Sequence, residues 1–242
     1  MKKFIALVCA AVVGVSAFAL DVTAGARGTF AWGLGTTLPA EDAEQMKTLK
    51  EATTSAGGTW SEGGNLGGGF GVYANLGLIN LGNLTLGLQP EFSMIFNNGY
   101  TVDYALGGTS QSVVYTDNSI DIPVLVTLSL PVTNTFAMRF GVGPYLSIPL
   151  GLDLITTSGG TETRATDTDG LTIESSLNFG LAFDVNFTNK LGIGSLVANV
   201  RYMLDFTPTK ATIKYNGTVV SDNEDLLTRR ALTVGIGYEI KF

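Results

Sequence analysis

Few residues of this chain could carry chemistry, because it contains no histidine and a single cysteine, Cys9. Without imidazole there is no Ser-His-Asp triad, and most zinc sites lose their usual ligand. Paired carboxylates such as Glu91 and Asp121 could in principle exchange protons with a substrate. The sequence supplies no nucleophile or set of metal ligands beside them. We therefore expect neither an enzyme nor a site for a metal or cofactor.

The charged residues occupy alternate positions in segments whose other positions are apolar. In the last segment, Val234 and Ile236 share one face, while Thr233 and Glu239 share the other. Such alternation predicts β-strands that separate an apolar from a polar environment. We place eight strands at Val22–Leu34, Gly67–Leu78, Leu84–Asn97, Ser119–Leu130, Phe136–Ile148, Leu171–Phe187, Ser195–Phe206 and Arg229–Phe242.

The connections between these strands alternate in length. The short ones are Ile79–Asn83, Pro131–Thr135 and Thr188–Gly194, and the long ones are Gly35–Leu66, Asn98–Asn118, Pro149–Gly170 and Thr207–Thr228. Short turns at one end and long loops at the other are typical of an outer-membrane barrel. The pattern predicts an all-β, eight-stranded antiparallel transmembrane barrel with short periplasmic turns and long extracellular loops. Within the first long loop, Pro39–Lys47 predicts a short helix, which would be a surface lid or a plug that grips a ligand.

Composition indicates that the apolar face meets lipid. Charged residues make up 14% of the chain, against about 25% in ordinary soluble domains. A secreted, lipocalin-like barrel with an apolar interior is the alternative, but its water-facing surface would be too poor in charge. Two aromatic girdles fit a barrel in a bilayer. They comprise Trp32, Phe70, Phe96 and Phe206 near the outer rim, and Phe136, Phe187 and Phe242 near the inner rim.

The first nineteen residues predict a secretory signal peptide. Lys2 and Lys3 precede the apolar run 4–15, and Ala17-Phe18-Ala19 has the form of a cleavage site. A buried N-terminal helix and a lipoprotein acylated at Cys9 are the alternatives. Cleavage after Ala19 would leave residues 20–242 as the barrel domain. It would remove two lysines from a formal net charge of −7, giving −9, which argues against nucleic acid as a partner.

Eight strands enclose a lumen only wide enough for side chains. Acidic and basic residues are both expected there, paired with one another because an unpaired buried charge is costly. Arg27 and Glu239 lie on the strands that would close the barrel, and Asp121 lies on a strand between those of Glu91 and Arg139. The predicted polar network comprises Arg27, Glu91, Asp121, Arg139, Glu174, Asp184, Arg201 and Glu239, with Gln89, Asn199, Asp205 and Lys241 also facing inward.

The last residues resemble the recognition signal of bacterial outer-membrane β-barrel proteins, a terminal phenylalanine preceded by alternating apolar residues. Here the matching residues are Val234, Ile236, Tyr238, Ile240 and Phe242. Three internal stretches resemble the small PorT-like barrel group, namely Gly87–Phe92, Ile120–Leu125 and Gly141–Tyr145. The resemblance implies a location in the bacterial outer membrane, contact with its lipids, and insertion by the barrel assembly machinery.

Two functions fit these features. The first is a structural or interaction protein whose lumen is mostly packed and whose long loops meet an extracellular ligand or a host surface. The second is a small porin-like channel for ions or small solutes.

Overall fold

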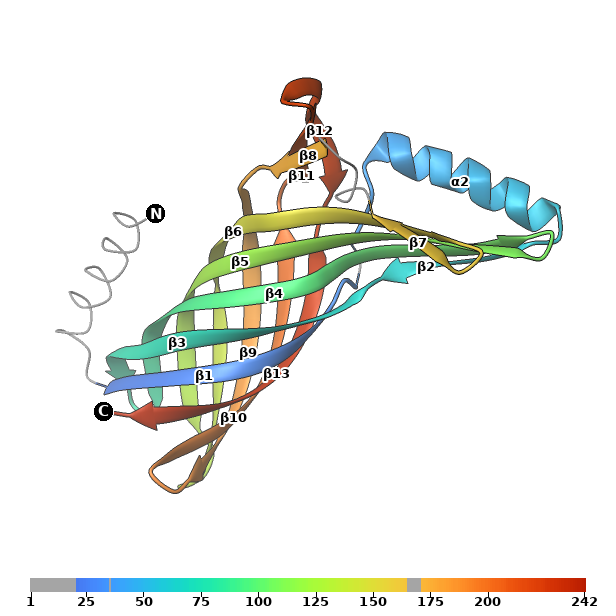
Figure 1. Ribbon diagram of the computed structural model, residues 1–242. Helices are drawn as coiled ribbons and strands as arrows, with labels where there is room; N and C mark the ends of the chain where they lie inside the picture. Colours follow the sequence, from blue (N-terminus) through green and yellow to red (C-terminus); the bar gives the residue numbers. More distant parts are fainter. Residues whose placement is uncertain (1–20, 35, 165–170) are drawn as a thin grey trace.

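The computed structural model describes residues 21–34, 36–164 and 171–242. The predicted signal peptide, 1–19, lies outside these residues. Eight long strands form an antiparallel, barrel-like sheet (Figure 1). They are β1 (Asp21–Trp32), β3 (Leu66–Leu81), β4 (Leu84–Leu106), β5 (Thr109–Pro131), β6 (Phe136–Ser158), β9 (Asn178–Leu191), β10 (Gly194–Asp205) and β13 (Arg230–Lys241).

Pairing joins the first strand to the last. In β1, Arg27 lies opposite Gly71 of β3 on one side and opposite Gly237 of β13 on the other. The remaining neighbours are β3–β4, β4–β5, β5–β6, β6–β9, β9–β10 and β10–β13. Each of the eight strands therefore has an antiparallel partner on both sides, and its backbone hydrogen bonds are made within the sheet.

All four of the predicted long loops contain strand residues. The prediction of a loop at Asn98–Asn118 is wrong, because β4 and β5 continue through this segment as a hairpin of two 23-residue strands. Its turn is Gly107-Gly108, with φ of +61° and +84°, the backbone shape of a tight hairpin turn. Strand β6 likewise runs on to Ser158 and pairs with β7 (Thr161–Arg164).

The predicted strand Leu171–Phe187 divides into two. Its first part, β8 (Leu171–Ser175), belongs to a separate three-stranded sheet with β11 (Thr209–Tyr215) and β12 (Thr218–Leu227). This small sheet lies at the end of the barrel that carries the long connections, which we call the outer end (Figure 1). The expected loop Thr207–Thr228 is thus mostly a β-hairpin, whose turn contains Asn216 and Gly217 at positive φ.

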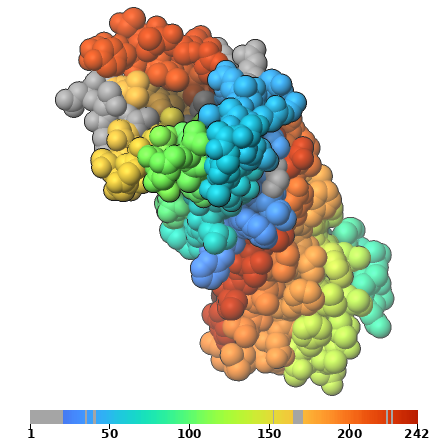
Figure 2. All heavy atoms as spheres, turned by 90° about the vertical axis from the view of Figure 1, so that its right-hand side faces the viewer, coloured from blue at the N-terminus to red at the C-terminus, as the bar shows by residue number. Residues whose placement is uncertain are grey.

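The predicted helix is present but longer, as α2 (Ala40–Ser55). It ends before Gly57, whose φ is +79°, and the chain returns through β2 (Thr59–Gly64), which pairs with the outer half of β4. Seen from the right-hand side of Figure 1, α2 lies beside the tip of the β4–β5 hairpin, with the β6–β7 hairpin next to it (Figure 2). Within the described residues, no helix is both long and apolar enough to cross a membrane.

Side chains alternate between the two faces of the sheet as the sequence pattern predicts. On β13, Thr233 is 3% exposed and Ile236 is 67% exposed. Aromatic pairs lie near the two ends of the barrel strands. Phe70 and Phe96 have ring centroids 6.3 Å apart, and Phe136 and Phe187 have centroids 6.5 Å apart. The outer face is therefore apolar and edged by aromatic residues, while polar side chains point inward.

One glycine of β1 makes room for a tyrosine in the lumen. A Cβ atom at Gly25 would lie 2.6 Å from Cζ of Tyr73, the residue opposite it on β3. We expect Gly25→Val to push the ring away and lower the free energy of unfolding by about 1–3 kcal/mol, the usual cost of overpacking. Gly28→Val is the matched control, because a Cβ there would meet nothing within 4 Å. Equilibrium urea unfolding in lipid vesicles compares the two, and equal losses would contradict this packing.

Candidate functional site

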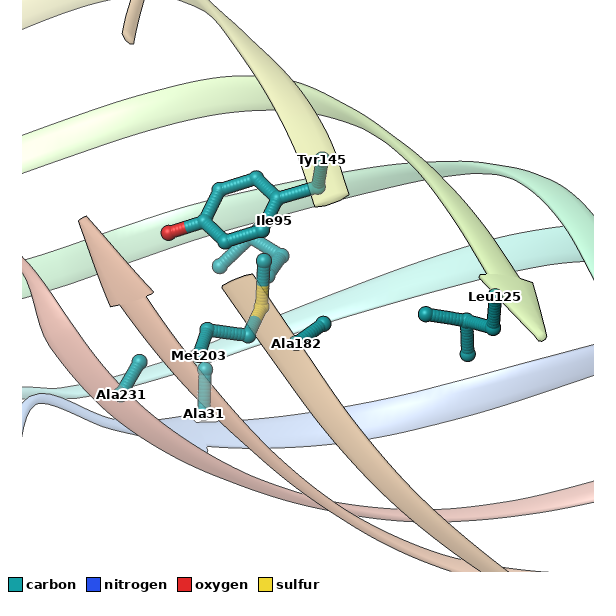
Figure 3. Close-up of a cluster of buried hydrophobic side chains, with 7 residues drawn as sticks. All are labelled: Ala31, Ile95, Leu125, Tyr145, Ala182, Met203 and Ala231. Atoms are coloured by element: carbon teal, nitrogen blue, oxygen red, sulfur yellow. The ribbon is translucent and has the colours of Figure 1, made fainter. Parts of the chain in front are cut away.

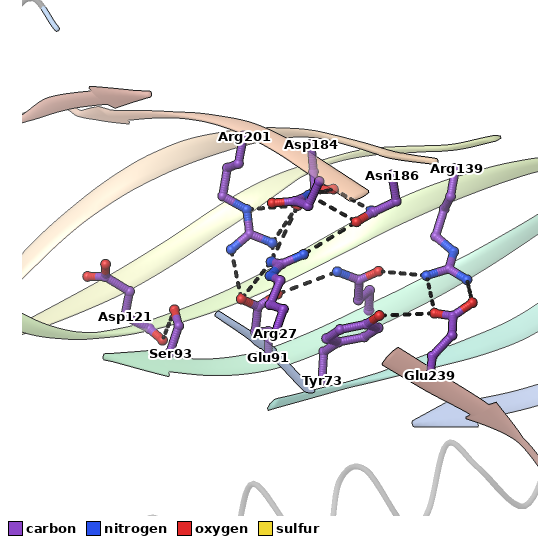
Figure 4. Close-up of polar contacts among 12 residues, drawn as sticks. Arg27, Tyr73, Glu91, Ser93, Asp121, Arg139, Asp184, Asn186, Arg201 and Glu239 are labelled. Carbon is purple, nitrogen blue, oxygen red and sulfur yellow. Dashed lines mark hydrogen bonds and ion pairs between the residues drawn. The ribbon is translucent and has the colours of Figure 1, made fainter. Parts of the chain in front are cut away.

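A cluster of six charged side chains fills the inner part of the lumen (Figure 4). We call it the lumen cluster; it consists of Arg27, Glu91, Arg139, Asp184, Arg201 and Glu239. The three guanidinium groups face three carboxylates, so the cluster is formally neutral. Each of these residues is almost fully buried. Buried charges remain ionised only when they are paired and hydrogen-bonded. That requirement explains why the cluster contains equal numbers of basic and acidic side chains.

Glu91 of β4 is the centre of the lumen cluster. It accepts two hydrogen bonds from Arg201, at 2.9 and 2.8 Å, and two from Nη2 of Arg27, at 2.7 and 2.5 Å. Arg201 also donates from Nε to Oδ2 of Asp184 at 2.8 Å. The planar guanidinium matches a carboxylate with two parallel bonds, which makes such pairs strong and directional. Four strands of the barrel are joined through these groups.

A second pair lies deeper in the same cluster. Arg139 of β6 donates to both carboxylate oxygens of Glu239 on β13, at 3.0 and 3.1 Å. Tyr73 adds a third hydrogen bond to Glu239, at 3.1 Å, and its ring lies 5.3 Å from the guanidinium carbon of Arg27. Gln89 lies between the two halves of the cluster, accepting from Arg139 at 3.4 Å and donating to Glu91 at 3.5 Å.

A second polar group, the outer cluster, lies toward the end with the long connections. It consists of Asp117, Ser119, Asp121, Tyr145, Asp205 and Arg229. Arg229 donates to Asp121 at 2.9 Å and to Ser119 at 2.8 Å, and its Nε lies 3.7 Å from Asp205. Asp117 interacts electrostatically with Arg229. Within the described residues, this single arginine faces three buried carboxylates.

Seven buried, mostly apolar residues form a further layer of the lumen, which we call the apolar layer (Figure 3). Along β10, Arg201 of the lumen cluster, Met203 and Asp205 of the outer cluster are successive inward residues. Met203 packs in the layer and is 1% exposed. Its seven members are buried residues from seven strands: Ala31, Ile95, Leu125, Tyr145, Ala182, Met203 and Ala231. The lumen is therefore filled by side chains at the layer and at both clusters.

The structure places most of the predicted network inside the lumen but changes several partners. Arg27, Glu91, Asp184 and Arg201 contact one another. Glu239, expected beside Arg27, bonds instead to Arg139. The side chains of Arg27 and Arg139 are long enough to reach carboxylates on strands that do not pair with their own strand.

Asp121 was expected near Glu91 and Arg139, but it pairs with Arg229 in the outer cluster. The prediction for Glu174 is wrong, because this residue lies on β8, outside the barrel, and is bonded to Lys214 at 2.6 Å. Lys241, also expected inside, is exposed at the end of β13 and lies 2.5 Å from Asp21. Residues 176–177, which belong to no strand, separate β8 from β9, and β8 pairs with β11 instead.

Five contributors were missed in the sequence: Tyr73, Asp117, Ser119, Tyr145 and Arg229. Alternation contains the signal for two of them. Arg229 lies two residues before Ala231, and Tyr145 lies six residues after Arg139, so both fall on the inward face. The residues of the predicted assembly signal face outward, from Val234 to Phe242, and Tyr238 donates to the carbonyl of Leu191 at 2.7 Å. Within the described residues, no group of three acidic or cysteine side chains is arranged to hold a metal ion.

An ion pair joins the helix α2 to strand β2. Nζ of Lys50 lies 2.8 Å from Oε1 of Glu62 on β2. The hydrogen bond from Lys50 is the main cause that holds the pKa of Glu62 below its ordinary value, and a bond from the Trp60 indole acts in the same direction. Both partners are partly exposed, so this pair orients the helix more than it stabilises the fold.

No protein-family model and no curated protein match the chain. Solved structures do. The outer membrane protein OprG from Pseudomonas aeruginosa has a TM-score of 0.51 at 16% identity, covering 92% of this chain and 97% of OprG. Neisserial surface protein A gives 0.46 at 12% identity, covering 91% and 97%. The attachment invasion locus protein Ail of Yersinia pestis gives 0.38 at 9%, covering 92% and 98%.

The likeness to OprG shows the fold. This chain forms an all-β, antiparallel, barrel-like sheet that resembles the barrels of outer-membrane proteins. The PorT-like grouping is not among these matches and stays a prediction.

Proposed function

We propose that this protein is a closed, eight-stranded β-barrel of the bacterial outer membrane whose lumen is packed and whose outer portion contacts molecules at the cell surface. The observation that carries the proposal is the filled lumen, in which the lumen cluster, the apolar layer and the outer cluster follow one another along the strands. A pathway for solutes would need accessible polar surface through the apolar layer, and its seven residues are 0–3% exposed.

The membrane assignment is supported by the outer face of the barrel. Exposed apolar side chains such as Phe30, Val126 and Ile236 would meet water in a soluble protein, which is unfavourable. In a bilayer they contact lipid instead, and this unfavourable exposure is avoided. The backbone supports the same proposal, because pairing on both sides of every barrel strand leaves no open edge. Insertion by the barrel assembly machinery, guided by the residues from Val234 to Phe242, belongs to this proposal.

The surface role is supported by the length of the strands. A tilted strand crosses a bilayer with about 9–11 residues. β4, β5 and β6 each have 23 residues, so about half of each lies beyond the apolar band. Together with β2, β7 and α2, these extensions form a polar projection at one end of the barrel (Figures 1 and 2). We call this part the outer platform.

A shortened variant tests the surface role. The backbone N–H of Gly33 donates to the carbonyl of Asn65 at 3.0 Å, so a two-residue Asn-Gly turn can replace residues 34–64 without breaking the β1–β3 ladder. Full-length and shortened proteins, each refolded in nanodiscs, are applied to arrays of glycans and extracellular-matrix proteins. We expect the full chain to be retained on some spots and the shortened variant to lose most of that retention. Equal retention of the two proteins would contradict the role of this segment.

A further inference from the structure

Three carboxylates of the outer cluster share one arginine. Asp117, Asp121 and Asp205 are 6%, 0% and 3% exposed, and Arg229, which they face, is 3% exposed. If all three acids were ionised, three negative charges and one positive charge would leave a net charge of −2 among buried groups. Uncompensated buried charge is costly, and a carboxyl group avoids that cost by keeping its proton. We therefore expect one of these acids to hold a proton more readily than an exposed carboxyl group does.

Hydrogen bonding distinguishes one acid from the other two. Asp121 accepts two hydrogen bonds from Arg229, at 2.9 and 3.3 Å. Asp205 accepts a hydrogen bond from the hydroxyl of Tyr145. The Oδ1 atom of Asp117 is buried and has no hydrogen-bond partner among the described residues. Hydrogen bonds to an ionised carboxylate favour its charged form, so the acid with an unpartnered oxygen, Asp117, is the one that favours a proton most.

The elements around Asp117 supply one cation and two further acids. Within the described chain, the charged groups that face it are Asp121 on β5, Asp205 on β10 and Arg229 just before β13. β6 contributes Tyr145, whose hydroxyl is directed to Asp205. β4 contributes the uncharged Asn98, which lies opposite Asp117, is 0% exposed and has no partner for either amide atom in the part of the chain described.

These surroundings set the direction of the pH dependence. Asp117 lies beyond Ser119–Leu130, the part of β5 that sequence alternation assigns to the bilayer. Burial is the largest influence and raises the pKa of Asp117 to about 6; Arg229 opposes the rise, and the two other acids add to it. In the unfolded chain an aspartate has a pKa of about 3.9. Between these two values the folded protein binds the extra proton, so its stability falls as the pH rises through this range.

Asp117 lies at the base of the outer platform, where β4 and β5 continue beyond the barrel (Figure 1). The β4–β5 ladder shifts register after Ile95, and the β5–β6 ladder shifts between Asn118 and Ser119. Such irregularities interrupt the ladder and bend the strands. A side chain spans one of them, because the backbone N–H of Asn97 donates to Oδ1 of Asn118 at 2.9 Å. Repulsion between ionised acids would therefore act where the platform is joined to the barrel by interrupted ladders.

We propose that the outer cluster is a pH-sensitive switch, which holds the base of the outer platform firmly while Asp117 is protonated and loosens it when Asp117 is ionised. The platform is then firmest at mildly acidic pH. The inference adds a regulation to the surface role and rests on the proposed function for that meaning, while the switch itself is a property of the fold.

Asp117→Asn tests the switch, because asparagine resembles the protonated acid and cannot ionise. Urea unfolding in lipid vesicles is followed at a series of pH values with EDTA present. Relative to the variant, we expect the unfolding constant of the unchanged protein to rise by up to about tenfold per pH unit between about pH 4 and about pH 6, the effect of one proton, and then to level off. Asp103→Asn is the matched control, because Asp103 is an exposed acid of β4 in the platform, and it should follow the unchanged protein.

Hydrogen exchange of backbone amides reports on the platform itself. Residues 98–118 are compared between the unchanged protein and Asp117→Asn at the same pH, so the chemical effect of pH on exchange cancels. We expect exchange to be several-fold slower in the variant at about pH 8 and nearly equal at about pH 5, with residues 136–145 as an unaffected reference. If Asp117→Asn does not refold, Asp121→Asn takes its place, and loss of the neighbouring charge should move the unfolding transition to lower pH.

Two results would overturn the inference: the same pH profile for Asp117→Asn and the unchanged protein, or equal exchange in residues 98–118 at about pH 8. Stabilisation by added calcium that Asp117→Asn abolishes would also overturn it, because a bound cation would then balance the acids. These measurements involve no surface ligand, so failure of the switch leaves the array result untouched. Equal retention of the shortened variant on the arrays would count against the surface role and leave the switch standing.

Discussion

Replacing Glu91 by alanine should lower the free energy of unfolding by about 3–5 kcal/mol, the range for breaking a buried ion pair from one side. Glu91 accepts hydrogen bonds from both Arg27 and Arg201. Its loss leaves these two guanidinium groups with Asp184 as the nearest carboxylate, 3.6 Å from Arg27. The cost comes from the cations that remain buried without this partner, more than from the bonds that are lost.

Equilibrium urea unfolding of protein refolded in lipid vesicles measures this effect. Glu44→Ala is the control, because Glu44 forms an ion pair at 3.8 Å with Lys47 on the exposed surface of α2. Such pairs contribute little, and we expect a change within about 0.5 kcal/mol. Exposed ion pairs contribute less than about 1 kcal/mol. If Glu91→Ala lowers the free energy of unfolding by no more than that, water solvates the lumen cluster.

Replacing Arg229 by methionine should be similarly costly, by about 3–5 kcal/mol. This arginine is 3% exposed, and its loss would leave Asp117, Asp121 and Asp205 without their shared cation. Arg229→Lys should cost less, because the charge is kept while the paired hydrogen bonds to Asp121 are lost. Adding Asp121→Asn to the methionine variant should recover part of the stability, since one unpaired charge is removed.

The neighbouring residue gives the control for this prediction. Arg230 points to the other face of β13 and is exposed, so Arg230→Met should change the free energy of unfolding by no more than about 0.5 kcal/mol. The same urea titration compares the two variants. Equal effects at 229 and 230 would contradict the inward placement of Arg229.

Alternation along the sequence predicted most of the side chains that face the lumen, Glu174 and Lys241 being the exceptions, but not which of them meet. On β13 the period of two separates Thr233 and Glu239 from Val234 and Ile236, and the structure follows it. The partners depend on the stagger of strands around the barrel, which no local pattern encodes. Arg27 lies on the strand next to that of Glu239, yet its side chain crosses to Glu91 on β4.

The outer platform was harder to predict for a different reason. Strands beyond the membrane need no apolar stripe, so the polar sequence between Asn98 and Asn118 has the composition of a loop. Its β-branched residues and the Gly107-Gly108 turn were the available signals for a hairpin.

Single-channel recording tests whether the lumen is packed by side chains. The refolded protein, verified by its heat-dependent gel mobility, is inserted into a planar lipid bilayer at moderate salt concentration. The apolar layer predicts no discrete conductance steps, and also none from Arg139→Ala, whose side chain lies below that layer. Stable steps from the unchanged protein, altered in size by Arg139→Ala, would show an open polar pathway and contradict the account.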